Sequence, residues 1–220
     1  MADAPVTVAD YLQNKAALDA AGPVSIVDGA ASIAAHLDDL NADPNVTSIT
    51  LSGVGGNVLT LTLAQTLADT HALAALATPF SIAATSSAGG VEALTTSQIA
   101  QLAASGVTQI VATDIDVNLA ALTTAQKEAL SASNLAIVEP YSGGSVEVLR
   151  FQANGDLGSV SYRGIVGQPY TQYTVSYGAN GQPASASYSN GMTASYTYLP
   201  NGGYDVLFAG VTGEPYTSYE

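Results

Sequence analysis

Tyrosines in the second part of the chain are the first residues whose type and spacing could do chemistry. Side chains alternate between the two faces of a strand, so tyrosines two residues apart share a face. Exposed rings could stack on pyranose sugars, or neighbouring rings could form cross-strand pairs that stabilise a sheet by about 0.2–1 kcal/mol each. Both interpretations apply to Tyr170, Tyr173, Tyr177, Tyr188, Tyr196, Tyr198, Tyr216 and Tyr219.

A second group of polar side chains lies in the segment 114–118, which reads Asp-Ile-Asp-Val-Asn. Alternate residues at the end of a strand point the same way, so Asp114, Asp116 and Asn118 could share one weakly bound calcium ion. Leu119 stands where an EF-hand loop requires glycine, which excludes that motif. The segment is therefore either a weak calcium site or a solvated strand end.

The sequence gives little indication of an enzyme. His36 and His71 are the only histidines, and each follows a helical pattern beside aspartates, without the converging ligands of a metal or hydrolytic site. No Gly-x-Ser-x-Gly motif presents a serine nucleophile. Cysteine is absent, which excludes disulfides and thiol catalysis. We therefore expect a non-enzymatic protein with no cofactor beyond weakly bound calcium.

Charge restricts the partners. The chain has 18 acidic residues against 4 basic ones, whereas strong binding to phosphate needs clustered lysine and arginine. Nucleic acid is therefore not expected as a partner, and no apolar run is long enough for membrane insertion. The remaining candidates are a glycan, a surface protein, or self-association through terminal repeats. The N-terminus lacks the basic and apolar regions of a Sec signal, so export would need another route.

The elements that position these residues begin with a repeated phrase, Leu-Thr-x-x-Gln. Threonine and glutamine at this spacing form a capping box, in which each side chain bonds the backbone N–H of the other residue at the start of a helix. An isoleucine of a β-rich run precedes each copy by 12 residues. The copies at 61–65, 94–98 and 122–126 predict helices over about 62–76, 95–104 and 123–131.

Strands and helices alternate through residues 1–140. Two further helices are expected over about 7–21 and 31–40, and the strands are centred on Ile26, Ile49, Ile82, Ile110 and Ile137. This order predicts parallel strands joined by right-handed crossovers. Spacings of 23 to 33 residues favour solenoid-like strand–loop–helix repeats. A compact doubly wound α/β domain made of the same strands is the alternative.

Residues 141–220 have a different composition, rich in tyrosine, glycine and serine. The pattern Gly-x-x-Gly-x-Pro-Tyr-Thr-x-Tyr stands at 164–173 and again at 210–219. Asn-Gly pairs tolerate the positive φ angles of type I′ turns and are a strong hairpin signal. They stand at 154–155, 180–181, 190–191 and 201–202. We expect a tyrosine-rich antiparallel β-hairpin meander that forms a second domain.

The hairpin part, about residues 145–220, resembles the YD (Rhs-type) repeat. Six residues follow the spacing of that repeat: Tyr177, Gly181, Tyr188, Gly191, Tyr196 and Tyr198. Gly178, Gln182 and Leu199 depart from it, because they stand where the repeat has Asp, Arg and Asp. The first part, about residues 5–140, resembles alanine-rich repeats of large secreted bacterial surface proteins. These resemblances imply an extracellular or cell-surface location.

The resemblance to YD repeats also implies three functions. We expect a non-enzymatic structural or adhesive repeat segment of a secreted or surface bacterial protein. The alternatives are a carbohydrate-binding module that uses exposed strand tyrosines, and a shell segment of a toxin-delivery (Rhs-like) protein.

Overall fold

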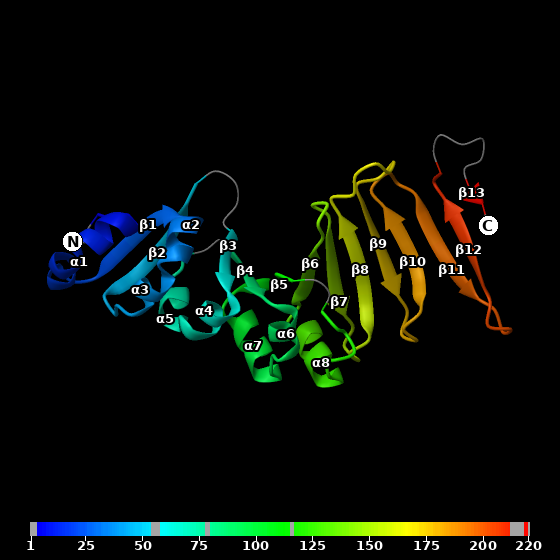
Figure 1. The fold of residues 1–220 in the computed structure, drawn as a ribbon, viewed down its shortest axis with the longest axis horizontal. Helices are drawn as coiled ribbons and strands as arrows, with labels where there is room; N and C mark the ends of the chain where they lie inside the picture. Colours follow the sequence, from blue (N-terminus) through cyan, green and yellow to red (C-terminus); the bar gives the residue numbers. More distant parts are fainter. Residues whose placement is uncertain (1–3, 54–57, 78–79, 115–116, 212–217, 220) are drawn as a thin grey trace. The chain divides into compact units, whose positions relative to one another are not determined.

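The chain forms two compact units that both contain helices and strands, which confirms the predicted mixed α/β content (Figure 1). The computed structural model describes residues 4–53, 58–77, 80–114, 117–211 and 218–219. The first unit comprises Met1–Ser86 and Ser97–Ile110, and the second comprises Ser87–Thr96 and Val111–Glu220.

The first unit is built from short parallel strand pairs and helices. Its elements are α1 (Val8–Ala21), β1 (Val24–Gly29), α2 (Ala30–Ala35), α3 (Leu37–Asn41), β2 (Val46–Ser52), β3 (Val58–Thr62), α4 (Leu63–Ala68), α5 (Thr70–Ala74), β4 (Ser81–Ser86), α7 (Thr96–Ala104) and β5 (Val107–Ala112). The first residue of α7, Thr96, and the last two of β5, residues 111–112, belong to the second unit. β1 pairs with β2 and β3 pairs with β4, both in parallel. The register aligns Ile26 with Ile49, as expected for parallel strands joined by helical crossovers. Stacking of these repeats into a solenoid stays a prediction.

Two predicted helices are broken. The helix expected over 31–40 divides at His36 into α2 and α3, and the one expected over 62–76 divides at Asp69 into α4 and α5. Ile33, Leu37 and Leu40, which lie on either side of the first break, are all fully buried. Burial of such side chains stabilises a fold by about 1.5–3 kcal/mol each. The break therefore leaves these side chains in the core.

The repeated phrase forms its predicted caps, although the chain before each cap differs. The Thr62 and Thr123 hydroxyls each accept a hydrogen bond from the backbone N–H three residues on, at 3.2 Å. In return, the glutamine Oε1 accepts a hydrogen bond from the threonine N–H. α7 begins one residue after Thr95. The preceding segment is β3 in the first copy, helix α6 (Ala88–Glu92) in the second, and a turn in the third. β3 was not expected, because its pairing with β4 is a tertiary contact.

The second unit is dominated by an antiparallel meander, as predicted. It contains α6, α8 (Thr124–Ala132), β6 (Ala136–Pro140), β7 (Val146–Phe151), β8 (Leu157–Arg163), β9 (Gln172–Tyr177), β10 (Pro183–Tyr188), β11 (Thr193–Tyr198), β12 (Tyr204–Ala209) and β13 (Ser218–Tyr219). From β6 onward each strand pairs antiparallel with the next. Because β6 pairs with β7, the ladder runs across the predicted boundary at 140–141, and that boundary stays a prediction.

The turns of the meander differ in type from the prediction. The glycines of all four Asn-Gly pairs have φ between 73° and 89°, but in the described residues the one non-glycine with positive φ is Asn134. The asparagines therefore do not adopt type I′ geometry. Each turn is a type I turn followed by a left-handed glycine, the arrangement of a three-residue hairpin loop. The asparagine Oδ1 accepts from the backbone N–H two residues on, at 3.0–3.2 Å, which favours this alternative.

Removal of the capping box before α8 tests the link between sequence and fold. We expect Thr123→Ala to lower the free energy of unfolding by about 0.5–2 kcal/mol, because it removes the N-cap acceptor. Gln126→Ala should cost more, since the Gln126 amide also donates to the carbonyls of Glu92 and Leu94. Urea unfolding followed by circular dichroism measures both. Thr193→Ala, at an exposed strand position, is the control and should change stability by less than about 0.5 kcal/mol.

Candidate functional site

The tyrosines of the meander lie on one face of its sheet. Directly paired residues point to the same side, and the register pairs Tyr162 with Tyr173, and Tyr173 with Tyr188. At the other end, Tyr198 pairs with Tyr204. Following the alternation from these pairs gives a surface that we call the tyrosine face: Tyr162, Tyr173, Tyr177, Tyr188, Tyr196, Tyr198 and Tyr204.

A row of apolar side chains crosses the middle of the tyrosine face. One residue from each strand pairs with the next, and the row consists of Ile137, Leu149, Val160, Val175, Ala186, Ala194 and Phe208. Ala186 and Ala194 are only 2% exposed. In the described residues α8 is the helix that packs on this sheet, at β7, and none covers β9–β12 (Figure 1). The flanking tyrosines therefore provide much of the cover for these alanines.

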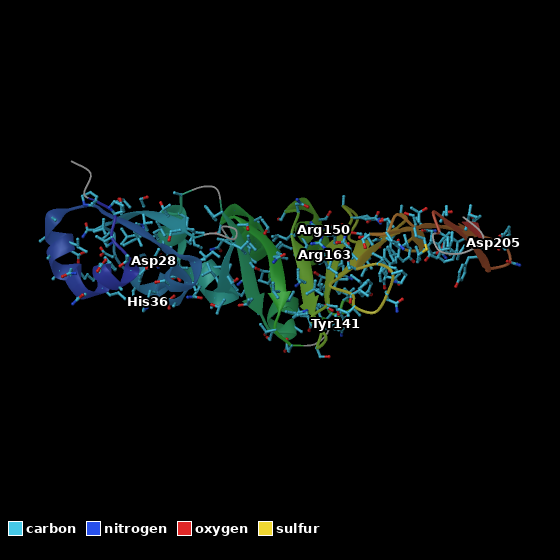
Figure 2. The ribbon with its side chains drawn as sticks, turned by 90° about the horizontal axis from the view of Figure 1, so that it is seen from above. Asp28, His36, Tyr141, Arg150, Arg163 and Asp205 are labelled. Atoms are coloured by element: carbon cyan, nitrogen blue, oxygen red, sulfur yellow. The ribbon has the colours of Figure 1, made fainter. Side chains whose placement is uncertain are left out.

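The opposite face is made largely of hydroxyl side chains. Two rows cross the strands there, and they consist of Ser159, Ser176, Ser185 and Ser195, and of Ser161, Thr174, Ser187 and Thr193. Ser161 and Thr174 share a hydrogen bond of 2.8 Å between their hydroxyls. Arg150 and Arg163 belong to this face by register, and Figure 2 shows them apart from Tyr141. The sheet thus has one aromatic face and one hydroxyl face.

Ring geometry divides the tyrosine face into two ends. At the first end the Tyr162, Tyr173 and Tyr188 rings stack in sequence, with centroid separations of 4.8 and 5.5 Å and interplanar angles of 24° and 23°. Tyr170 packs edge-on against Tyr173 and Tyr188. Stacked rings cover one another's faces, which are the surfaces that a sugar would need. This end therefore fits the interpretation of a cross-strand ladder.

At the second end, the rings are not stacked. Tyr204 lies 6.4 Å from Tyr196 and 6.0 Å from Tyr198 between ring centroids, with interplanar angles of 46° and 45°. Tyr204 is 61% exposed, and the Tyr198 hydroxyl is held by the Pro183 carbonyl at 2.8 Å. A tilted, exposed ring beside a fixed one can accept a flat apolar ligand surface. The predicted sugar-stacking residues thus separate into a buried ladder and this open group.

The ladder tyrosines are poorly suited to proton transfer. The pKa of Tyr162 is held well above its ordinary value of 10.0, first by burial and then by its hydrogen bond to Glu147 at 3.0 Å. Burial likewise raises the pKa of Tyr173 and Tyr177. Tyr141 also donates to Glu147. Tyr162, Tyr173 and Tyr177 therefore stay protonated near neutral pH, so they can pack and donate hydrogen bonds but cannot act as bases.

Two members of the predicted calcium triplet serve local structure. The Asp114 carboxylate accepts from the Ala88 N–H at the start of α6, and the Asn118 side chain accepts from the Ala120 N–H at 3.1 Å. Asp116 lies outside the described residues. Within the residues that are described, no three His, Asp or Glu side chains gather in a way that could hold a metal. A calcium ion at this triplet stays a prediction.

Two of the predicted tyrosines have side chains outside the described residues, and two tyrosines of the tyrosine face were not predicted. Tyr216 and the side chain of Tyr219 lie outside the described residues, although the Tyr219 backbone pairs with Phe208. Tyr162 and Tyr204 complete the tyrosine face but were not among the expected residues. In β8, Val160 and Tyr162 alternate with serines, and this sequence signal could have identified Tyr162.

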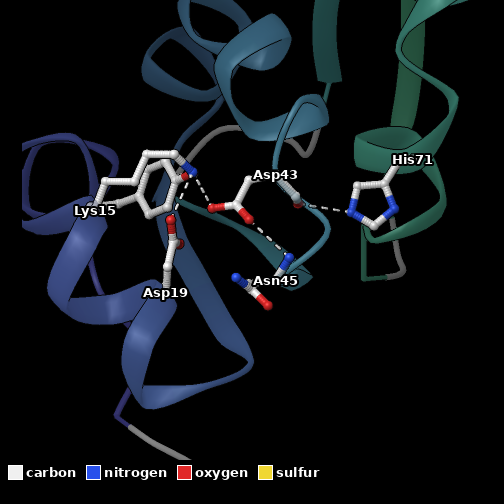
Figure 3. Close-up of polar contacts among 6 residues, drawn as sticks. Lys15, Asp19, Asp43, Asn45 and His71 are labelled. Carbon is white, nitrogen blue, oxygen red and sulfur yellow. Dashed lines mark hydrogen bonds and ion pairs between the residues drawn. The ribbon is translucent and has the colours of Figure 1, made fainter.

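A polar network that the sequence did not reveal joins α1 to the turn before β2 (Figure 3). The fully buried Tyr11 donates to Asp43 at 2.6 Å, and Lys15 bonds both the Tyr11 hydroxyl and the Asp43 carboxylate. Asp43 is 3% exposed and also accepts from the Asn45 N–H at 2.9 Å. Burial and the bond to Asp43 raise the pKa of Tyr11 to about 12. The arrangement is therefore a structural ion pair between the half-exposed Lys15 and the buried Asp43, and not an acid–base site.

Replacing the central ring of the ladder tests its contribution to stability. Tyr173→Ala should lower the free energy of unfolding by about 2–3 kcal/mol, because it removes a half-buried aromatic ring and two stacked contacts. Chemical unfolding monitored by circular dichroism measures the change. Ser187→Ala, on the hydroxyl face, is the matched control and should have little effect. Equal, small effects would contradict the ladder.

Alkaline titration tests the burial of the same tyrosines. Their folded pKa values lie above the unfolded value of 10.0, so their contribution to stability is complete below pH 10.0 and is lost as the pH rises above it. We expect the tyrosinate absorbance of Tyr162, Tyr173 and Tyr177 to develop together with the loss of the circular dichroism signal. Ionisation of all 12 tyrosines near pH 10.0 with unchanged secondary structure would contradict this.

Comparison with known proteins does not assign the chain to a family. In the described part of the chain, no helix combines the length and apolar character needed to span a membrane. Models of known protein families, curated protein sequences and solved structures were compared with the chain, and none matches it.

Proposed function

We propose that the chain is a non-enzymatic structural or adhesive repeat segment of a secreted or cell-surface bacterial protein. The observation that carries this proposal is the stacked tyrosine ladder on a sheet that has no helix over β9–β12 in the described residues. Such a sheet presents two broad faces and gains its stability from strand-to-strand contacts, so similar hairpins can be added in series. This is what a surface segment made of repeats requires.

Composition supports the same role. A chain without cysteine cannot rely on disulfides, so packing must take a larger share in stabilising a secreted form. Here the tyrosine rings, together with neighbouring apolar side chains, take the place of a second protein layer over Ala186 and Ala194. Aromatic pairs in these orientations add about 0.5–1.5 kcal/mol beyond simple burial. The extracellular location itself rests on composition and on the resemblance to secreted repeats.

A second function, carbohydrate recognition, is favoured by the open end of the tyrosine face. Tyr196, Tyr198 and Tyr204 are tilted and not stacked, and Tyr204 has the most exposed tyrosine side chain among the described residues. A pyranose ring could rest on Tyr204. The toxin-delivery shell, the remaining alternative, rests on the YD resemblance alone.

Hydrogen exchange tests the structural role. If the ladder joins the strands into one cooperative plate, backbone amides of β8–β11 should exchange slowly and at similar rates, as in one cooperative unit. Tyr173→Ala should accelerate exchange in β8, β9 and β10 together, whereas Ser187→Ala should not. Rapid exchange throughout these strands in the unmodified chain would overturn the proposal of a rigid structural segment.

A glycan array with the 220-residue chain decides between the two functions. The structural role predicts no saturable binding to any saccharide. Tyr204→Ala is the informative variant for recognition, and Leu207→Ala is its control, because Leu207 is also exposed on β12 but lies on the opposite face. Saturable binding that is lost only in Tyr204→Ala would replace the structural role with carbohydrate recognition.

A further inference from the structure

A cavity of about 390 Å³ in the first unit lies where α3, α4 and the end of β3 meet. Four of its six lining residues are polar, and the lining consists of Asp38, Thr62, Ala64, Gln65, Ala68 and Asp69. It therefore brings two carboxylates, a hydroxyl and an amide together in the first unit, whereas the tyrosine face belongs to the second. No motif in the sequence marks this group, because Asp38 and Asp69 are 31 residues apart.

Asp69 is an unusual residue to find in this position. It sits at the break between α4 and α5, is 5% exposed, and its Oδ2 atom has no hydrogen-bond partner. The neighbouring Asp38 is also a carboxylate and offers no donor when ionised. Burial first, and then the hydrogen-bonding contact with Asp38 and the charge of Asp38, raise the pKa of Asp69 to about 6. A buried carboxylate without a partner is costly, because its lost hydration is not replaced.

The first unit supplies no basic side chain to neutralise this pair. Its one lysine or arginine is Lys15, which is engaged by Asp43 and by Asp19 at 3.5 Å. His36 pairs with Asp39 at 3.2 Å, and the ring of His71 bonds the Asp43 carbonyl at 3.1 Å. The Gln65 amide donates to Asp38 at 3.3 Å, but it carries no charge. The first unit therefore has no further lysine or arginine to neutralise this pair.

We propose that Asp38 and Asp69 bind a divalent cation, and that this cation is Ca²⁺. Calcium takes six to eight oxygen ligands in flexible geometry, and carboxylates are its preferred protein ligands. The two aspartates offer four oxygens, the Thr62 hydroxyl lines the same cavity, and the cavity volume leaves room for water to complete the shell. Mg²⁺ demands stricter octahedral geometry and gives up its water reluctantly, so it fits this open group less well.

The site is independent of the predicted triplet at 114–118, which lies in the second unit. With two carboxylates and several waters, its affinity should fall in the range of about 10⁻⁴–10⁻³ M that is typical of weak extracellular calcium sites. Occupation of the cavity would offset the repulsion between Asp38 and Asp69, so calcium should stabilise the folded chain.

The test is calorimetric titration of the full chain with CaCl₂ at neutral pH, together with thermal unfolding with and without about 10 mM CaCl₂, a concentration above the expected dissociation constant. We expect one bound Ca²⁺ and a raised Tm. Asp69→Asn keeps the shape of the side chain and removes its charge. It should weaken calcium binding at least about tenfold and abolish the calcium-dependent rise in Tm. Asp38→Asn changes an exposed position and should have the same two effects, so it provides the test if Asp69→Asn does not fold.

Two controls separate this site from non-specific binding. Asp39→Asn changes an adjacent acid that pairs with His36, and Asp114→Asn changes the predicted triplet. Both should bind calcium as the unmodified chain does. The proposal is overturned if the unmodified chain shows neither binding heat nor a rise in Tm. It is also overturned if Asp69→Asn and Asp38→Asn bind as tightly as the unmodified chain, or if Asp114→Asn alone abolishes binding.

Discussion

The alternation of side chains along antiparallel strands is the constraint on which the second unit depends. It sends every strand tyrosine from Tyr162 to Tyr204 to one side and the serines and threonines to the other. At β9–β12, where no helix of the described residues lies over it, the sheet must cover its own apolar row, and small residues such as Ala186 and Ala194 allow flanking rings to do so. Stacking between Tyr162, Tyr173 and Tyr188 then couples the strands to one another. Stability and surface chemistry therefore come from the same residues.

Scarcity of basic side chains has different consequences at two buried aspartates of the first unit. Asp43 is buried with donors from Lys15, Tyr11 and Asn45, and these bonds hold its pKa well below the usual range although burial alone would raise it. Asp69 is buried to a similar degree, but Asp38 is its charged neighbour, and its pKa moves in the opposite direction. The contrast arises from the partner and not from the degree of burial. With its lysine already engaged by Asp43, the unit has no further lysine or arginine for the second site.

Features set by neighbouring residues could be predicted from sequence, and features set by packing could not. The capping boxes at Thr62 and Thr123 and the glycine turns of the meander need only a few adjacent residues, and they occur where expected. The breaks at His36 and Asp69 and the strand β3 depend on burial and on pairing with distant segments. The Asn-Gly turns show both effects, since the position was right but the asparagine side-chain bonds select a different turn type. For the candidate site, the aromatic residues could be named in advance, whereas their division into stacked and tilted groups required the strand register.

That division bears directly on function. A sugar-binding surface needs ring faces that are open to solvent. A ladder that stabilises the sheet needs ring faces that are covered by neighbouring rings. At Tyr162, Tyr173 and Tyr188 the faces are used within the protein, so these residues stabilise the sheet at the expense of recognition. At Tyr204 the tilt of about 45° relative to Tyr196 and Tyr198 leaves the ring exposed, and less stacking energy is gained. If recognition occurs on this sheet, it therefore belongs at the β11–β12 end, where loss of a ring would remove a contact surface without dismantling the ladder.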